Sequence, residues 1–327
     1  MNSGLDSSGK YNILVVQIGR IGDMILTTPL FSELKKIFPN STLTVLANPK
    51  NCDVIKYETT IDRILIYRKD VFNIVKLITK LKKEHFDIWI DPKYGYSKTS
   101  EFLLKICKPK QSYGYNFNKL VFSTAIPVYE NPEHYINLCL NVLKCFNIDS
   151  ADYENQKPII QIPEANQKKY GSSLNSKIIA INISAGSITR IWQKENWLKL
   201  LNEINKLHPD YEFIVIYMDR ENAIVKYITN NYKDNNIKYF KSNDILEISD
   251  LISNVNLVIT PDTSLVHIAS AFNIPIIALY PNVNWNYERF SPKSDIQEII
   301  ISDSEKDIFN IKTEEVLNKF TKIDRRI

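Results

Sequence analysis

The chain of 327 residues is 44% hydrophobic and 24% charged, which excludes a disordered protein and suits two folded α/β domains of about 150 residues each. Its longest apolar runs, such as residues 274–280, are far shorter than the roughly 20 residues that a transmembrane helix needs. The formal net charge of +4 is small and comes without interleaved aromatic motifs, so we expect no nucleic-acid partner.

The charge is unevenly distributed along the chain. Residues 1–150 carry 20 Lys and Arg against 14 Asp and Glu, whereas the remainder carries 21 against 23. Excess positive charge attracts anionic partners over a long range, which indicates an anionic acceptor or peripheral contact with the inner membrane surface. Lysines that only keep the protein in solution explain the same excess, and the sequence leaves both interpretations open.

The first residues and the cysteines bear on where the protein works. The opening MNSGLDSSGK lacks the apolar stretch of a signal peptide, so we expect a cytoplasmic protein. The cysteines lack the CxxC spacing of metal or redox sites. We therefore expect four reduced packing residues and no metal site: Cys52, Cys107, Cys139 and Cys145.

In the first half, buried-strand patterns alternate with helical ones. The run at 12–18 is apolar and β-branched, as a parallel strand buried on both faces should be. A helical pattern begins near Asp23 and stops at Pro39. The predicted elements in chain order are strand 12–18, helix 23–38, strands 42–47 and 63–67, helix 73–83 and strand 86–90.

A polar stretch after Tyr153 has the chemistry of a linker, with Pro158, Pro163 and the segment 167–173. We therefore predict domains at 11–165 and 174–327. A second alternating series predicts a second parallel sheet. Its strands are 177–183, 212–217, 238–240, 256–260 and 275–280, and its helices are 195–207, 221–231, 246–253 and 264–272.

A glycine-containing loop, Gly19-Arg-Ile-Gly-Asp23, follows the first strand, at the sheet edge where α/β proteins bind ligands. Gly19 and Gly22 let the backbone turn tightly and approach a ligand, and Asp23 lies at the start of the next helix. In the alternative, Asp23 is only a helix cap while Thr27 and Thr28 face solvent. No third glycine completes a dinucleotide fingerprint, and no acidic residue ends the second strand, which argues against a dehydrogenase.

A second loop, at 182–193, surrounds Gly186 with small hydroxyl residues and carries Arg190. The guanidinium of Arg190 offers donors that grip a phosphate in two places at once, so the loop suits a diphosphate. In the alternative, Arg190 and Trp192 form a surface cation–π or packing pair. The hydroxyl residues are Ser184, Ser187 and Thr189.

The third loop, at 260–267, also follows an apolar strand. We expect Asp262 or Thr263 to cap the next helix, whose free N–H groups and positive dipole end form an anion site. His267 lies four residues beyond Thr263 and so shares its helix face. A histidine that is simply part of a buried core is the alternative.

Three segments together resemble glycosyltransferase family 9, the bacterial heptosyltransferases of lipopolysaccharide and related surface-glycan synthesis. They are ILVVQIGRIGDMILTTP at 13–29, SAGSITRIWQKENW at 184–197 and PDTSLVHIASAFNIPIIALY at 261–280. The resemblance covers nearly the whole chain. Three motifs in the family's order and spacing are more specific than any one of them.

The resemblance implies the α/β architecture called GT-B, in which two Rossmann-like domains have parallel sheets that face across a cleft. It implies that the first domain binds the acceptor and the second the nucleotide-sugar. It further implies inverting transfer, without a metal ion or cofactor, of heptose or a related sugar from an ADP-activated donor such as ADP-heptose. The acceptor would be a lipopolysaccharide core or another surface glycan or glycolipid.

The same resemblance assigns site residues. Asp23 matches the family's proposed catalytic base, with Gly22 and Thr27 on the acceptor side. Arg190 stands on the diphosphate, where the family usually has lysine, and Glu221 is placed on the donor ribose. The donor-side residues are Ser184, Gly186, Thr189, Arg190, Glu221, Asp262, Thr263, Ser264 and His267.

Two positions depart from the family pattern. Arg190 keeps the positive charge of lysine but is bulkier and planar, which changes how it holds phosphates. Ser264 replaces a glycine and places a side chain where the backbone would approach the donor. We expect these changes to shift donor preference rather than remove the chemistry. Residues 281–290, rich in asparagine and aromatic side chains, either line the sugar pocket or form a surface loop packed by Trp285.

An inverting transfer needs a base for the proton of the acceptor hydroxyl and positive groups for the leaving nucleoside diphosphate. We predict that Asp23 is the base and that Arg190, with the helix start at 262–264, is the positive group. His267 would orient the donor rather than act as a nucleophile. Two alternatives stay open: a nucleotide-sugar 2-epimerase of the same architecture, and a catalytically silent nucleotide-sugar-binding protein.

Overall fold

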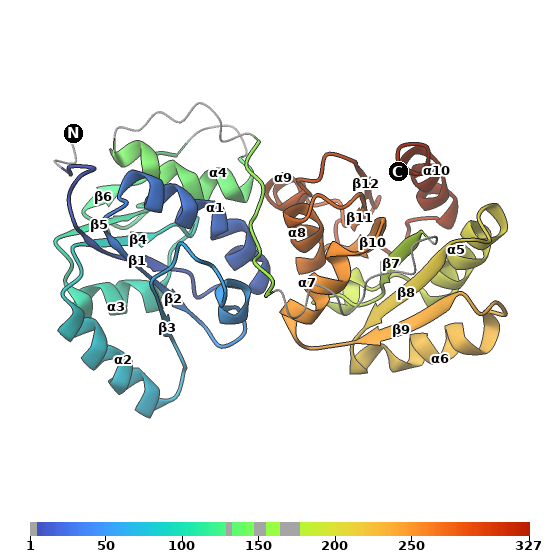
Figure 1. Ribbon diagram of the computed structural model, residues 1–327, viewed down its shortest axis with the longest axis horizontal. Coiled ribbons are helices and arrows are strands. Elements are labelled where there is room, and N and C mark those ends of the chain that lie inside the picture. Colours follow the sequence, from blue (N-terminus) through green and yellow to red (C-terminus); the bar gives the residue numbers. More distant parts are fainter. Residues whose placement is uncertain (1–4, 129–132, 147–154, 164–176) are drawn as a thin grey trace. The chain divides into compact units, whose positions relative to one another are not determined.

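The computed structural model describes residues 5–128, 133–146, 155–163 and 177–327. The chain forms two compact units whose boundary falls between Gln161 and Ile162 (Figure 1). The predicted linker at 167–173 lies outside the described residues, so the domain limits 11–165 and 174–327 stay predictions.

Unit 1 is built on a six-stranded, fully parallel sheet with the order β3-β2-β1-β4-β5-β6. The order reverses between β1 and β4, so the loops that leave these strands diverge and open a crevice at their carboxyl ends. In chain order the elements are β1 (Asn12–Val16), α1 (Ile21–Ile37), β2 (Thr42–Ala47), η1 (Cys52–Ile55), β3 (Arg63–Ile66), α2 (Val71–Glu84), β4 (Ile88–Asp91), α3 (Lys98–Cys107), β5 (Gln111–Gly114), β6 (Thr124–Ala125), α4 (Tyr135–Leu140) and η2 (Asn141–Phe146).

Helices cover both faces of this sheet (Figure 1). On one face, α2 and α3 pack against the strands through a cluster that includes Leu77, Leu81, Trp89 and Leu103. On the other face, α1 and α4 lie against each other. Burial on both faces explains why the central strands are continuously apolar, as the sequence indicates.

Unit 2 repeats the plan with the order β12-β11-β10-β7-β8-β9, again fully parallel. Its order reverses between β7 and β10. In chain order the elements are β7 (Ile178–Asn182), η3 (Ile188–Arg190), α5 (Lys194–Leu207), β8 (Glu212–Tyr217), η4 (Asp219–Glu221), α6 (Asn222–Asn231), β9 (Ile237–Lys241), α7 (Ile245–Ser253), β10 (Leu257–Pro261), α8 (Ser264–Ala271), β11 (Ile276–Tyr280), α9 (Asn284–Phe290), β12 (Gln297–Ile301) and α10 (Thr313–Asp324).

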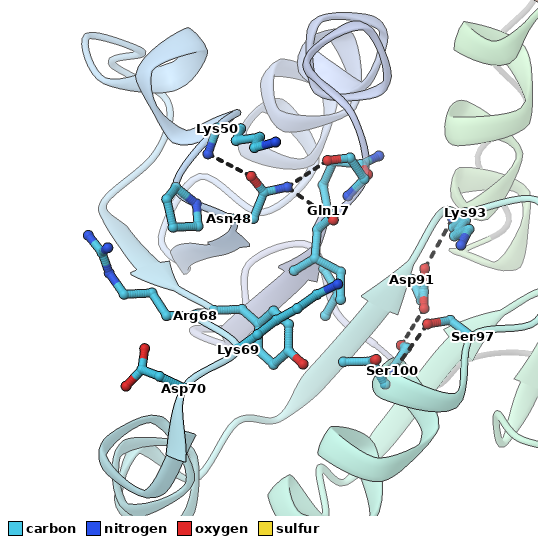
Figure 2. A pocket seen from close by; sticks show the side chains of 16 residues that line it. Gln17, Asn48, Lys50, Arg68, Lys69, Asp70, Asp91, Lys93, Ser97 and Ser100 are labelled. Carbon is cyan, nitrogen blue, oxygen red and sulfur yellow. Dashed lines mark hydrogen bonds between the residues drawn. The ribbon is translucent and has the colours of Figure 1, made fainter. Parts of the chain in front are cut away.

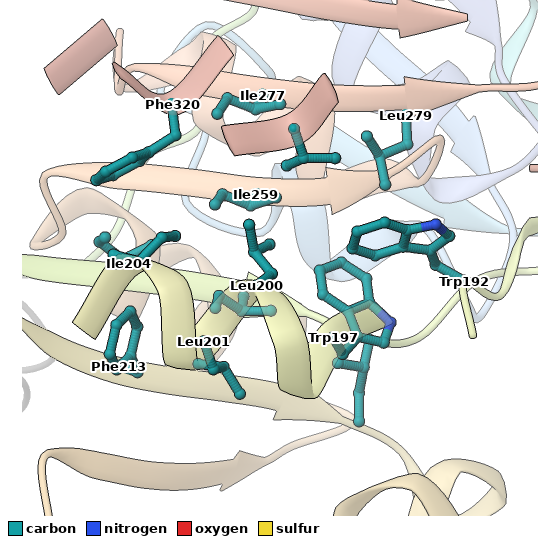
Figure 3. Close-up of a cluster of buried hydrophobic side chains, with 14 of the residues drawn as sticks. Trp192, Trp197, Leu200, Leu201, Ile204, Phe213, Ile259, Ile277, Leu279 and Phe320 are labelled. Atoms are coloured by element: carbon teal, nitrogen blue, oxygen red, sulfur yellow. The ribbon is translucent and has the colours of Figure 1, made fainter. Parts of the chain in front are cut away.

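The core of unit 2 fixes the loop that follows β7. Figure 3 shows Trp192 and Trp197 beside the branched side chains of the sheet, and their rings meet edge to face at 4.8 Å. The indole N–H of Trp192 donates to the carbonyl oxygen of Ile311 at 2.9 Å. Because this ring is fully buried, it anchors the neighbouring residues 184–190 to the core.

The predicted strands of both units are confirmed, with ends that differ by one or two residues. The structure adds elements that the sequence did not predict: β5, β6, β12, α3, α4, α9 and α10. The four cysteines are free thiols, as expected. Among the described helices, none combines the length and hydropathy needed to cross a bilayer.

Candidate functional site

In unit 1, a sharp turn after β1 holds the carboxylate of Asp23. The backbone N–H of Arg20 donates to Asp23 Oδ2 at 2.8 Å, which places Asp23 in the first turn of α1 rather than at its cap. A Cβ at Gly19 would lie 2.4 Å from Asp23 Oδ2, so a larger residue there would displace the Asp23 carboxylate. The turn therefore brings backbone and carboxylate close together at the carboxyl end of the sheet.

The environment of Asp23 favours a base. Burial raises the pKa of this carboxyl above its ordinary value, while the Arg20 N–H and the charges of Arg20 and Lys93 act in the opposite direction. A carboxylate with a raised pKa accepts a proton more readily at neutral pH. The residue thus combines partial burial with higher basicity.

Thr27 supports this turn from inside the unit. Its hydroxyl donates to the carbonyl oxygen of Asp23 at 2.7 Å and accepts from Gln17 Nε2 at 2.7 Å. Thr27 is 0% exposed and Thr28 1%, so neither faces solvent and Thr27 cannot contact an acceptor here. The expectation of an acceptor contact at Thr27 is corrected by this burial. Gly22 is half-buried beside Asp23.

A cavity of about 670 Å³ opens at the carboxyl ends of β1 to β4, where the strand order reverses (Figure 2). Gly19 forms part of its wall, so the cavity adjoins the Asp23 turn. Its charged lining consists of four cations and two acids, so the lining carries a net positive charge. The lining includes Gln17, Asn48, Lys50, Arg68, Lys69, Asp70, Asp91, Lys93, Ser97 and Ser100.

The sequence did not reveal this cavity, because its cations come from three separate loops. Lys50 follows β2, Arg68 and Lys69 follow β3, and Lys93 follows β4. Within the part of the chain that the structure describes, none of the four forms an ion pair. They give the cavity unpaired positive charge, which suits an anionic ligand.

Asp91 is the buried acid of the cavity wall. It accepts hydrogen bonds from the Ser100 hydroxyl and from the Lys93 backbone N–H, the latter at 3.1 Å (Figure 2). Burial raises its pKa from 3.8 to about 6, against the opposing effect of these hydrogen bonds and the Lys93 charge. The residue ties the β4–α3 loop to the wall at a cost in desolvation.

Asp91→Asn is therefore expected to stabilise the protein above about pH 6. The raised pKa means that the folded chain holds the proton more tightly than the unfolded chain, so stability falls as pH rises between about 4 and 6. Removing the buried charge should add up to about 3 kcal/mol at about pH 8, at about 1.4 kcal/mol for each pKa unit. Urea denaturation at about pH 5 and pH 8 measures this gain. The exposed Asp53→Asn is the control, and an equal gain in both variants would contradict the argument.

In unit 2, Asn182 joins the two loops that leave β7 and β10. Its amide nitrogen donates to Thr260 Oγ1 at 2.8 Å and lies 3.2 Å from Thr263 Oγ1, while its Oδ1 accepts from the Ser184 N–H at 3.0 Å. It is 1% exposed. Sequence reasoning did not single it out, because a lone asparagine at a strand end gives no local signal of these long-range bonds.

Arg190 and Asp262 form the central charged pair of this region. Arg190 Nη1 donates to Asp262 Oδ2 at 2.6 Å and to its carbonyl oxygen at 3.1 Å. Asn286 on α9 donates to the same carboxylate oxygen at 2.8 Å. Because Trp192 is buried in the core, the alternative of a surface Arg190–Trp192 pair is wrong. In the segment 281–290, the side chain of Trp285 is 56% exposed, so it does not pack this loop against the core.

The start of α8 lies beside this pair. Thr263, not Asp262, is the N-cap, and its hydroxyl accepts from the Leu265 N–H at 3.3 Å. Ser264 is the first helical residue and is half-buried. His267 is 4% exposed, and burial lowers its pKa to about 3, so its ring is neutral. Its Nδ1 is buried and has no hydrogen-bond partner among the described residues.

The remaining residues predicted to bind the donor lie in the loops that follow β7 and β8. The Ser184 hydroxyl donates to Glu221 Oε2 at 2.7 Å, and Arg220 Nε donates to Glu221 Oε1 at 2.5 Å. Glu221 is 1% exposed, so in this arrangement its carboxylate holds protein groups rather than a ribose. Thr189 shares a hydrogen bond with Ser187 at 2.9 Å, and a Cβ at Gly186 would lie 3.4 Å from Arg190 Nη2.

The structure thus assembles Ser184, Arg190, Asp262, Thr263 and His267 at one switch point of unit 2, and Asp23 beside the cavity of unit 1. Among the described residues there is no group of three or more His, Cys, Asp or Glu side chains placed to hold a metal ion.

Comparisons with known proteins agree with this arrangement. The model of Glycosyltransferase family 9 (heptosyltransferase) matches residues 74–320. Lipopolysaccharide heptosyltransferase 3 of Escherichia coli is 22% identical over 280 residues, covering 79% of this chain and 80% of its own. A glycosyl transferase family 9 structure from Veillonella parvula superposes with a TM-score of 0.82 at 18% identity, covering 97% and 99%. E. coli heptosyltransferase WaaC with ADP gives 0.76 at 11%, covering 95% and 99%. The predicted GT-B fold is confirmed.

Proposed function

The chain belongs to glycosyltransferase family 9, and we propose that it transfers heptose or a related sugar from an ADP-activated donor to a lipopolysaccharide core or another surface glycan. As a member of this family it is a glycosyltransferase enzyme rather than a 2-epimerase, and the transfer assay below separates it from a silent binding protein. The observation that carries the proposed mechanism is the Asp23 carboxylate, with its raised pKa, beside a cationic cavity. We propose a single displacement that inverts the anomeric carbon.

Asp23 acts as the general base in this proposal. It takes the proton of the acceptor hydroxyl while that oxygen forms a bond to the anomeric carbon of the donor. At the same time, the bond from that carbon to the diphosphate oxygen breaks, and the nucleoside diphosphate leaves with the electron pair. The half-buried position of Asp23 favours this role, because its raised pKa increases proton affinity at neutral pH.

Arg190 stabilises the leaving diphosphate. Asp262 engages only Nη1 of its guanidinium, so the other donors of Arg190 have no hydrogen-bond partner among the described residues. The N–H groups at the start of α8, next to Thr263 and Ser264, add a second positive region. Because these groups supply the charge compensation, we propose that transfer needs neither a metal ion nor a cofactor.

The other residues predicted on the donor side hold the loops in place or orient the donor. A neutral His267 with an unpaired Nδ1 suits a hydrogen bond to the donor rather than charge stabilisation. Ser184 and Glu221 act together, since the buried carboxylate fixes the Ser184 hydroxyl. Gly186 and Thr189 shape the loop that carries Arg190.

The cavity of unit 1 suggests the class of acceptor. Four cations that form no ion pair with a described residue line it, and two of them, Lys69 and Lys93, come from opposite walls (Figure 2). We propose that it binds an acceptor glycan bearing phosphate or carboxylate groups. The excess positive charge of residues 1–150 points the same way, and a cytoplasmic enzyme working at the inner face of the membrane would meet such a glycolipid.

Donor identity is tested by thermal shift. ADP-sugars at about 100 times their Kd should stabilise the protein by about 2.7 kcal/mol and raise Tm by about 5 °C or more, whereas UDP- and GDP-sugars should not. Arg190→Ala should reduce the shift, and the exposed Lys241→Ala serves as a matched control because its ion pair with Asp219 lies at the surface. Equal shifts with all three nucleotides would refute an ADP-specific donor.

A further inference from the structure

Helix α2 (Val71–Glu84) exposes apolar side chains at its amino-terminal end. Val71 is 79% exposed, Phe72 77% and Val75 57%, whereas Leu77 and Leu81 on the opposite face are buried against the sheet. A turn of about 100° per residue places the three exposed side chains on one side of the helix. Soluble surfaces normally scatter such residues singly, so three together on one helix end call for a partner.

The rest of the exposed face is cationic. Lys76, Lys80, Lys82 and Lys83 are all exposed, and none forms an ion pair with a described residue. Glu84 does not belong to this cationic face, because its carboxylate pairs with Arg63. This surface, Val71, Phe72, Val75 and the four lysines, is named the α2 face below.

The α2 face is continuous with the cavity. Arg68, Lys69 and Asp70 line the cavity (Figure 2), and Val71 and Phe72 follow them directly in the sequence. Asp70 accepts a hydrogen bond from the Asn73 N–H at 3.0 Å, which caps the helix. The apolar tip therefore begins within one residue of the wall that we assign to an anionic acceptor.

The charge pattern selects the partner. Lysine is depleted at protein interfaces relative to the rest of the surface, so a helix face that carries four lysines after a small apolar tip does not suit a protein partner. A helix face with a few apolar side chains and surrounding lysines suits the interface of an anionic bilayer, where the apolar groups insert and the lysines meet headgroups.

We propose that the α2 face docks unit 1 onto an anionic lipid bilayer and so presents the cavity to a lipid-linked acceptor. The docking itself stands on the exposed side chains of α2, while the purpose given to it rests on the proposed function. Val71, Phe72 and Val75 enter the interfacial layer. The lysines select phosphatidylglycerol-type headgroups over zwitterionic ones.

Vesicle co-sedimentation of the full chain tests the docking. Wild type should bind vesicles containing phosphatidylglycerol at least about tenfold better than pure phosphatidylcholine vesicles, and high salt should weaken this binding. Phe72→Ser with Val75→Ser should reduce binding about tenfold. The control, Leu207→Ser, removes a 58% exposed apolar side chain beside Lys206 on α5 and should bind as wild type does.

Several outcomes would overturn the docking: equal binding to both vesicle types, unchanged binding by the Phe72/Val75 variant, or equal loss in the Leu207 control. The docking would also be overturned if the wild type binds no vesicles but forms a dimer in analytical ultracentrifugation that the Phe72/Val75 variant does not form. The face would then bind a second copy of the chain.

The two proposals fail separately. If the wild type sediments with anionic vesicles but transfers no sugar, the docking holds and the proposed function fails. If the Phe72/Val75 variant keeps its ADP-sugar thermal shift but loses vesicle binding, the docking holds and donor binding does not depend on it.

Discussion

Asp23→Asn is expected to lower kcat for sugar transfer by about 10²- to 10⁴-fold while leaving the donor thermal shift unchanged. Asparagine keeps an oxygen that can accept the Arg20 N–H, so the turn at Gly19 should survive the change. What is lost is the group that takes the proton of the acceptor hydroxyl. Initial rates at saturating donor and acceptor measure the effect.

The pH dependence gives a second readout for Asp23. Transfer requires the deprotonated carboxylate, so kcat/KM should rise with pH through the pKa of Asp23 and then level off. Because burial raises that pKa, the acid limb should lie above the range of an ordinary aspartate. Asp53→Asn changes an exposed carboxylate of the same unit and should leave both rate and profile as in wild type. A full rate in Asp23→Asn would remove the base from this mechanism.

Arg190→Ala is expected to reduce kcat about 10²- to 10³-fold and to destabilise unit 2. The rate falls because a preorganised positive group no longer meets the leaving diphosphate. The stability falls because the side chain of Asp262, which is 8% exposed, loses its cation, and an uncompensated carboxylate at such a site costs about 3 kcal/mol. Arg190→Lys should recover part of the rate, since the charge returns without the planar fork.

A double variant separates the two effects of Arg190. Adding Asp262→Asn to Arg190→Ala removes the stranded charge, so urea denaturation should show most of the stability restored while transfer stays slow. Lys241→Ala breaks an exposed pair with Asp219 and should change neither quantity appreciably. Full recovery of kcat in the double variant would mean that Arg190 serves only to hold Asp262.

The strands and the ligand-bearing loops could be predicted because their signals are local. Each central strand is a short apolar run buried on both faces, and each candidate loop follows such a run directly. The two-residue strand β6 carries too few residues for a periodic pattern, and β12 alternates only weakly in burial. These two strands could be identified only from the structure.

The pairings within the sites could not be predicted, because they depend on strand order. Arg190 and Asp262 are far apart in the chain and meet because β7 and β10 are neighbours where the order of unit 2 reverses. The cavity of unit 1 likewise draws Lys50, Lys69 and Lys93 from loops that only the sheet brings together. A sequence pattern shows a loop's chemistry but not its neighbours.

Burial determines the roles of two further residues, Thr27 and Glu221. The motif around Thr27 gave no sign of which helix face turns inward, and its complete burial makes it a support of Asp23 rather than an acceptor contact. Glu221 matches an acidic position beyond β8, yet its carboxylate is taken up by Ser184 and Arg220. The family resemblance predicted a ligand contact in both cases.

The transfer reaction itself tests the central claim most directly. The enzyme, ADP-heptose and a lipopolysaccharide-core acceptor bearing phosphate or carboxylate groups are incubated with excess EDTA, and mass spectrometry and NMR follow the products. We predict that the acceptor gains one heptose, that the new glycosidic bond has the anomeric configuration opposite to the donor's, and that Asp23→Asn gives almost none. Retention of configuration, a requirement for added metal, or undiminished product from Asp23→Asn would contradict the account.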